Sequence, residues 1–125
     1  LRDAMYYVKR LHEEHGYVFH AITSQTDDEY AQHLRTKNLC ELFGPTVFET
    51  YCYLDTGADK DEALEPYRDT GCYWIEDKPE NVNLGQCIGL NGLLVAHPHN
   101  SDSSLQDGVM RVQSWSDIYN IVTNS

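Results

Sequence analysis

The chain has 125 residues, of which 20 are acidic and 9 are basic, giving a formal net charge of -11. This length predicts one domain with a hydrophobic core, and the negative charge opposes non-specific attraction to nucleic acid polymers and anionic membranes. No apolar run is long enough to span a bilayer, and no stretch has the pattern of a secretory signal. We therefore expect a soluble, cytoplasmic protein.

Helical and strand patterns alternate along the whole chain. The sequence predicts helix 1–15, strand 17–22, helix 27–43, strand 48–54, a helix from about 59, strand 72–75, helix 79–87, strand 93–96, strand 109–112 and helix 115–122. Such alternation is typical of an α/β fold with a mostly parallel sheet and helices on both faces. Gly16 ends the first helix, and the second is expected to break or re-form before Leu39.

The start of the chain and its cysteines add two expectations. Leu1, Met5 and Val8 already follow helical spacing, so the chain is expected to be a fragment or to have lost residues before Leu1. The four cysteines have no CxxC spacing, and they are expected to be buried free thiols in a reducing compartment. They are Cys40, Cys52, Cys72 and Cys87.

Polar groups follow three of the predicted elements. Thr23 and Ser24 come after the first strand, where hydroxyls can bind phosphate oxygens or simply form a turn. Lys60 falls in the first turn of a predicted helix, where its charge opposes the helix dipole, so it is expected to have a role beyond the helix. Glu76 and Asp77 end an apolar strand just before Pro79, either as ligands of a divalent metal or as a helix cap that faces water.

The histidines offer weaker candidates. His12 and His15 lie three apart on the first helix, and a solvated face explains them better than a metal site. His97 and His99 flank Pro98, which favours an extended backbone that points them apart. We expect residues 97–100, which end in Asn100, to line a crevice.

The hydroxyl, lysine and carboxylate groups, taken in the order in which they occur along the chain, resemble the motifs of the haloacid dehalogenase superfamily of phosphotransferases, in particular its 5'(3')-deoxyribonucleotidase-like branch. The matching stretches are VFHAITS at 18–24, ADK at 58–60 and WIEDKP at 74–79, followed by GLLVAHP at 92–98 and RVQSW at 111–115. The resemblance covers nearly the whole chain. It implies a single three-layer α/β/α Rossmann-like core, residues 1–125, without a cap domain and without its first strand.

The resemblance also implies a reaction, the Mg²⁺-dependent hydrolysis of phosphate monoesters, with nucleotides among the candidate substrates. Thr23 and Ser24 would hold a phosphoryl oxygen, and Lys60 would offset the phosphate charge. Asp77 would bind Mg²⁺, with Glu76 as a second ligand or acting through water. The nucleophilic Asp-x-Asp motif has no counterpart before the Thr23 strand, so this chain is expected to be inactive and to bind Mg²⁺ weakly at best.

The family's first strand would lie between the Thr23 strand and the Trp74 strand. Without it two strand edges are left unpaired, so the two strands are expected to pair directly or to take a strand from a partner, with a homodimer favoured. A non-catalytic α/β binding or assembly module remains the alternative function. A phospho-acceptor receiver domain fits less well, because the acidic strand here follows the lysine. The substrate itself, a phosphorylated small molecule, is not specified by the sequence.

Overall fold

The structure is a computed structural model that describes residues 3–24, 28–54, 60–97 and 104–124. It is an α/β protein in which every strand pairing of these residues is parallel. Contacts divide the chain into an N-terminal unit, Asp3–Ala58, and a C-terminal unit that includes Asp59–Ser125. None of the helices within the described ranges is long and apolar enough to cross a membrane.

Two helices of the N-terminal unit follow local signals in the sequence. Helix α1 (Ala4–His15) ends at Gly16, whose φ of 75° is left-handed and suits glycine. Helix α2 (Glu29–Phe43) begins after Asp28, whose side chain accepts a hydrogen bond from the backbone N–H of Tyr30 at 2.9 Å. The predicted break before Leu39 is wrong, because no glycine or proline interrupts this helix.

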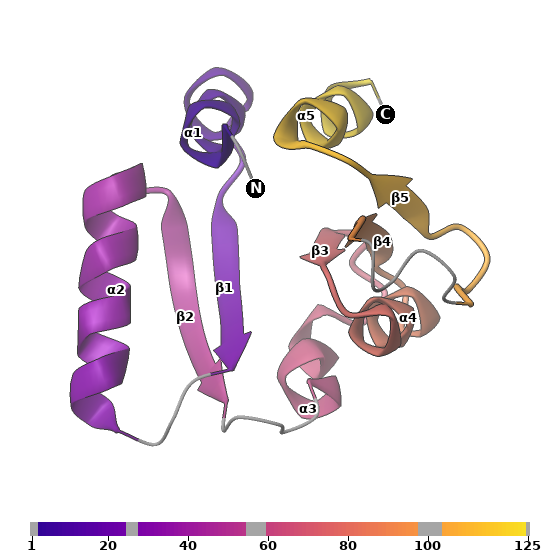
Figure 1. Ribbon diagram of the computed structural model, residues 1–125, viewed down its shortest axis with the longest axis horizontal. Helices are drawn as coiled ribbons and strands as arrows, with labels where there is room; N and C mark the ends of the chain where they lie inside the picture. The colour runs from indigo at the N-terminus through magenta and orange to yellow at the C-terminus, as the bar shows by residue number, and fades with distance from the viewer. Residues whose placement is uncertain (1–2, 25–27, 55–59, 98–103, 125) are drawn as a thin grey trace. The chain divides into compact units, whose positions relative to one another are not determined.

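The sheet of the N-terminal unit has two strands. Strands β1 (Phe19–Ser24) and β2 (Phe48–Leu54) run parallel and side by side, with α2 next to β2 (Figure 1). Phe48 joins these elements, since its ring lies 6.0 Å from that of Phe19 and 5.5 Å from that of Phe43. The register pairs Thr23, near the carboxyl end of β1, with Tyr53.

The C-terminal unit holds a three-stranded parallel sheet in the order β3-β4-β5. Figure 1 shows α4 below this sheet and α5 above it. The elements are α3 (Asp61–Leu64), the 3-10 helix η1 (Glu65–Tyr67), β3 (Tyr73–Glu76), α4 (Pro79–Cys87), β4 (Asn91–Val95), β5 (Met110–Val112) and α5 (Trp115–Thr123). The predicted helix 79–87 is therefore confirmed at both ends, as is strand 48–54 in the other unit.

The core of the C-terminal unit lies around β4 and the helix that precedes it. Leu93 and Leu94 point to opposite faces of the sheet, and both are buried, as expected for the central strand of a parallel sheet. Helix α4 approaches β3 closely at Gly85, where an added Cβ would clash with the ring of Trp74. The Trp74 indole N–H donates to the backbone oxygen of Asn81 at 2.9 Å and so fixes the start of α4 against the strand.

The described strands form two sheets, one in each unit, and a single sheet that joins them stays a prediction. One prediction needs correction. The cysteines are free, but they are not buried. Cys72 and Cys87 are exposed because they lie just before β3 and at the last residue of α4, while Cys40 and Cys52 are half-buried.

Pairing with a second chain stays a prediction. In the described part of the chain β3 is an end strand of its sheet, and its far edge could accept a strand from a partner copy. Light scattering after gel filtration is expected to give about twice the 14.4 kDa mass of one chain. Tyr73→Lys, which places a charge on the end strand, should favour the monomer, whereas Tyr6→Lys on the exposed part of α1 should not. A single-chain mass at all concentrations would contradict this prediction.

Candidate functional site

A buried ion pair lies at the carboxyl end of β3. Lys60 Nζ donates a hydrogen bond to Glu76 Oε2 at 2.9 Å, and the two side chains are only 11% and 7% exposed. The same ammonium lies 5.6 Å from the centroid of the Trp74 ring, within the range of a cation–π contact. Residues 16 positions apart in the sequence are thus joined in a water-poor environment.

The strand places Glu76 in this buried position. Side chains alternate along a strand, so Glu76 lies on the same face as Trp74, which packs against α4. The other carboxylate oxygen, Oε1, accepts hydrogen bonds from the backbone N–H groups of Asp77 and Lys78, at 3.0 and 3.3 Å. Both oxygens of Glu76 therefore have partners, as a buried carboxylate requires.

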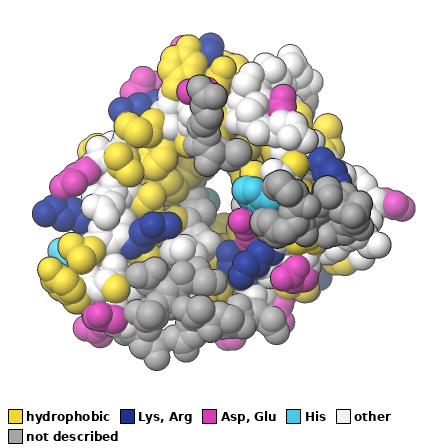
Figure 2. Space-filling view, in the orientation of Figure 1, with side chains coloured by type: hydrophobic (Ala, Val, Ile, Leu, Met, Phe, Trp, Pro, Cys, Tyr) yellow, Lys and Arg dark blue, Asp and Glu magenta, His cyan; other side chains and the backbone are white. Residues whose placement is uncertain are grey.

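Asp77 and His97 meet at the same end of the sheet. Strand β3 runs parallel to β4, and its last residue, Glu76, is in register with Leu94. The residues that follow the two strands emerge at one edge, which brings Asp77 Oδ2 within 3.8 Å of His97 Nε2. Figure 2 shows a histidine beside acidic and basic side chains on the face toward the viewer.

The environment of Asp77 favours its charged form. Its pKa lies below the ordinary value, chiefly because of a hydrogen bond with the Glu76 side chain, while partial burial opposes the shift. A backbone hydrogen bond and the charges of His97 and Lys78 lower the pKa further. Asp77 is therefore an ionised and accessible carboxylate at neutral pH, with 52% of its side chain exposed.

These residues fit Mg²⁺ only in part. Mg²⁺ prefers several oxygen ligands in octahedral geometry and commonly uses one or two protein carboxylates with water and substrate phosphate. Asp77 can serve as one such ligand, whereas Glu76 already binds Lys60 and two backbone amides. Within residues 3–24, 28–54, 60–97 and 104–124, no three His, Cys, Asp or Glu side chains are placed to hold one metal ion.

Three of the residues predicted from sequence lie together: Lys60, Glu76 and Asp77. Thr23 belongs to the N-terminal unit, so its convergence with them stays a prediction. The side chain of Ser24 falls outside the described residues.

Residues 97–100 were expected to line a crevice. The structure describes His97 of this segment, whereas His99 and Asn100 lie outside the described residues. The contact of His97 with Asp77 was not predicted. The signal that could have found it is their position one and two residues after the ends of two strands that pair in parallel.

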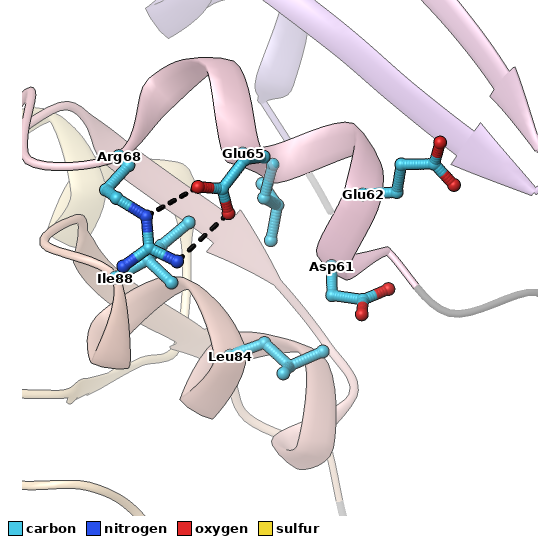
Figure 3. Close-up of a pocket in the computed structure, with 7 residues that line it drawn as sticks. Asp61, Glu62, Glu65, Arg68, Leu84 and Ile88 are labelled. Carbon is cyan, nitrogen blue, oxygen red and sulfur yellow. Dashed lines mark hydrogen bonds and ion pairs between the residues drawn. The ribbon is translucent and has the colours of Figure 1, made fainter.

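A groove of about 370 Å³ lies between α3, η1 and α4 (Figure 3). Its apolar side includes Leu84 and Ile88, and its polar side includes Glu65 and Arg68. Arg68 donates two hydrogen bonds to the Glu65 carboxylate, at 2.6 and 3.0 Å. Arg68 and Glu65 therefore neutralise each other's charge. The described lining of the groove contains none of the residues predicted for phosphate or metal binding.

Comparison with models of protein families finds none that matches this chain, and comparison with curated proteins also finds no match. Membership of the haloacid dehalogenase superfamily therefore stays a prediction from the motifs.

The Lys60–Glu76 pair makes a testable contribution to stability. Lys60→Met should lower the free energy of unfolding by about 3 kcal/mol, because it leaves the buried Glu76 carboxylate without its counter-charge. Adding Glu76→Gln should recover part of the loss, since the neutral amide has less need of a cation. Urea denaturation measures both variants, with the exposed Lys78→Met as a control expected within about 0.5 kcal/mol of wild type. A Lys60→Met effect no larger than the control would contradict this reading of the pair.

The lowered pKa of Asp77 predicts a pH dependence of stability. At a pH between the lowered pKa of folded Asp77 and its ordinary value of 3.8, the unfolded chain binds more protons than the folded chain. A fall in pH through this range therefore favours unfolding. The stability due to ionised Asp77 is therefore present above pH 3.8 and is lost as the pH falls through the folded-state pKa. Denaturation of wild type and Asp77→Asn should give a stability difference that is constant near neutral pH and changes below this value. A difference that does not vary with pH would refute the assignment.

Proposed function

We propose that this chain carries the lysine and metal-binding parts of the active site of a Mg²⁺-dependent phosphate monoester hydrolase of the haloacid dehalogenase type, and that it is inactive by itself. The observation that supports this most directly is the position of Lys60, which is held by Glu76, the residue before Asp77, at the carboxyl end of a parallel strand. Ligand sites of open α/β sheets occur at such strand ends.

Each group has a role in this proposal. Lys60 supplies positive charge to a phosphoryl group, and Glu76 holds the lysine side chain in one orientation. Asp77 binds the cation, which when present neutralises phosphate oxygens. Thr23 donates a hydrogen bond to a phosphoryl oxygen. The covalent step of the family needs a carboxylate nucleophile, for which the sequence offers no counterpart before the Thr23 strand.

The second candidate is a non-catalytic α/β binding or assembly module. One observation favours it: the Lys60 ammonium is already neutralised by Glu76, and its side chain is 11% exposed. A buried pair of this kind can serve the fold without any ligand. Binding of phosphate therefore separates the two candidates more directly than activity does.

The test combines turnover with binding. With p-nitrophenyl phosphate and Mg²⁺, hydrolysis should not exceed that of a Lys60→Ala control. Inorganic phosphate with Mg²⁺ should nevertheless shift the backbone amide resonances of residues 60 and 76–78, and Asp77→Asn should weaken this binding about tenfold. Lys9→Ala is the control, since Lys9 is an exposed lysine on α1 in the other unit.

Each outcome is informative. Lys60-dependent turnover would show that the chain is active and would overturn the second half of the proposal. The absence of any phosphate-dependent shift in folded wild-type protein would reject the phosphatase assignment and leave the binding or assembly module. Because loss of the Lys60 ammonium is expected to lower stability, circular dichroism checks that each variant is folded before it is compared.

A further inference from the structure

An asparagine followed by a glycine lies at the start of β4, at Asn91 and Gly92. In such a pair the backbone nitrogen of the glycine can attack Cγ of the asparagine, because glycine has no side chain that hinders the approach. A bond forms between that nitrogen and Cγ as the bond from Cγ to Nδ2 breaks, and ammonia leaves with the amide proton. Water then opens the resulting succinimide to aspartate or isoaspartate. The pair therefore carries an intrinsic route to the loss of an amide and the gain of a negative charge.

The fold requires the glycine of this pair. An added Cβ at Gly92 would lie 2.9 Å from Cγ2 of Val82 and 3.3 Å from Cγ2 of Val109. Val82 is fully buried, so its short branched side chain has little room to move away. Helix α4 can therefore pack this closely on β4 because the residue at this point has no side chain.

The asparagine also has a structural role. Asn91 Nδ2 donates a hydrogen bond to the backbone oxygen of Gly71 at 2.8 Å, and the Asn91 backbone N–H donates to the oxygen of Cys72 at 2.9 Å. These bonds tie the start of β4 to the residues that precede β3 and hold the Asn91 side chain in one orientation. Each residue of the labile pair thus serves the packing of the C-terminal unit.

Gln86 covers the nitrogen that would react. The Gly92 backbone N–H donates a hydrogen bond to Oε1 of Gln86 at 2.8 Å, a length typical of a well-formed bond. Gly92 is also buried, whereas Asn91 is exposed. Attack needs a nitrogen that has lost its proton and is free to approach Asn91 Cγ in the correct geometry. A nitrogen that is shielded from water and bonded to Gln86 meets neither condition.

We propose that Asn91–Gly92 is a latent deamidation site that Gln86 masks in the folded chain. The site opens when the contact of α4 with β4 is lost, even locally, so aspartate or isoaspartate at position 91 marks chains in which this contact has opened. The product also disfavours reclosing, since a carboxylate cannot donate to Gly71 and isoaspartate lengthens the backbone at the residue in register with Tyr73. This modification is independent of the proposed function.

Peptide mass spectrometry of the whole chain, after incubation in mildly alkaline buffer, measures the conversion at Asn91. The folded wild type should deamidate there at least about tenfold more slowly than the chain unfolded in guanidinium chloride. Gln86→Met keeps a side chain of similar length without an oxygen acceptor, and it should raise the rate in the folded chain about fivefold, as expected for loss of one hydrogen bond. Gln86→Glu retains a carboxyl oxygen and should stay within about twofold of wild type.

Asn83→Ala is the matched control. Asn83 lies one turn before Gln86 on α4, and its side chain also binds backbone groups, since it donates to the oxygen of Ser104 and accepts from the N–H of Gln106. Its loss removes a neighbouring contact but leaves the Gly92 N–H covered, so the rate at Asn91 should change by less than about twofold. In guanidinium chloride all variants should deamidate at equal rates, because the chemistry of the pair is unchanged.

Hydrogen exchange of the wild-type chain supplies a second measurement that needs no variant. The Gly92 amide should be protected, and conditions that speed its exchange should speed deamidation at Asn91 by a similar factor. Equal deamidation rates for the folded and unfolded wild type would overturn the proposal. So would a Gly92 amide that exchanges as fast as in the unfolded chain, or a folded Gln86→Met variant no faster than Asn83→Ala.

Discussion

The buried pair of Lys60 and Glu76 is the interaction on which the candidate site depends. Removal of two charges from water costs several kcal/mol each, and this cost is offset only when the geometry is good and the remaining hydrogen bonds are satisfied. Here the pair is 2.9 Å apart, and the second Glu76 oxygen accepts two backbone N–H groups. The pair therefore orients the lysine and also orders the turn that carries Asp77. The Glu76 carboxylate thus connects the end of β3, the turn that follows it and the Lys60 ammonium.

The packing of β3 against α4 makes this arrangement possible. The glycine at position 85 lets the helix approach the Trp74 ring, and the indole N–H binds the helix at Asn81. Trp74 and Glu76 then share the face of the strand that lies under the helix, so the aromatic ring forms one side of the environment of Lys60. The parallel register with β4 brings His97 to the same edge. Asp77 is thereby placed between a structural ion pair on one side and an accessible histidine on the other.

This geometry changes the roles that the sequence assigned to the two acids. Adjacent carboxylates after a strand resemble two metal ligands, but alternation along the strand buries Glu76 and leaves Asp77 accessible. Glu76 is thus better described as the partner of Lys60, and Asp77 as the more exposed carboxylate of the two. The unfavourable position of Lys60 at the start of α3 is also explained, since its charge is balanced by Glu76.

The sequence by itself determined the class of fold, the order of the elements and several of their bounds, because Gly16, Asp28, Pro79 and similar signals act on the chain within a few residues of themselves. It also selected Lys60, Glu76 and Asp77. Only the tertiary structure decided that Lys60 binds Glu76, that His97 faces Asp77 and that the described strands form two sheets. These features depend on which strands pair and which face a helix covers, and such long-range contacts leave no local pattern in the sequence.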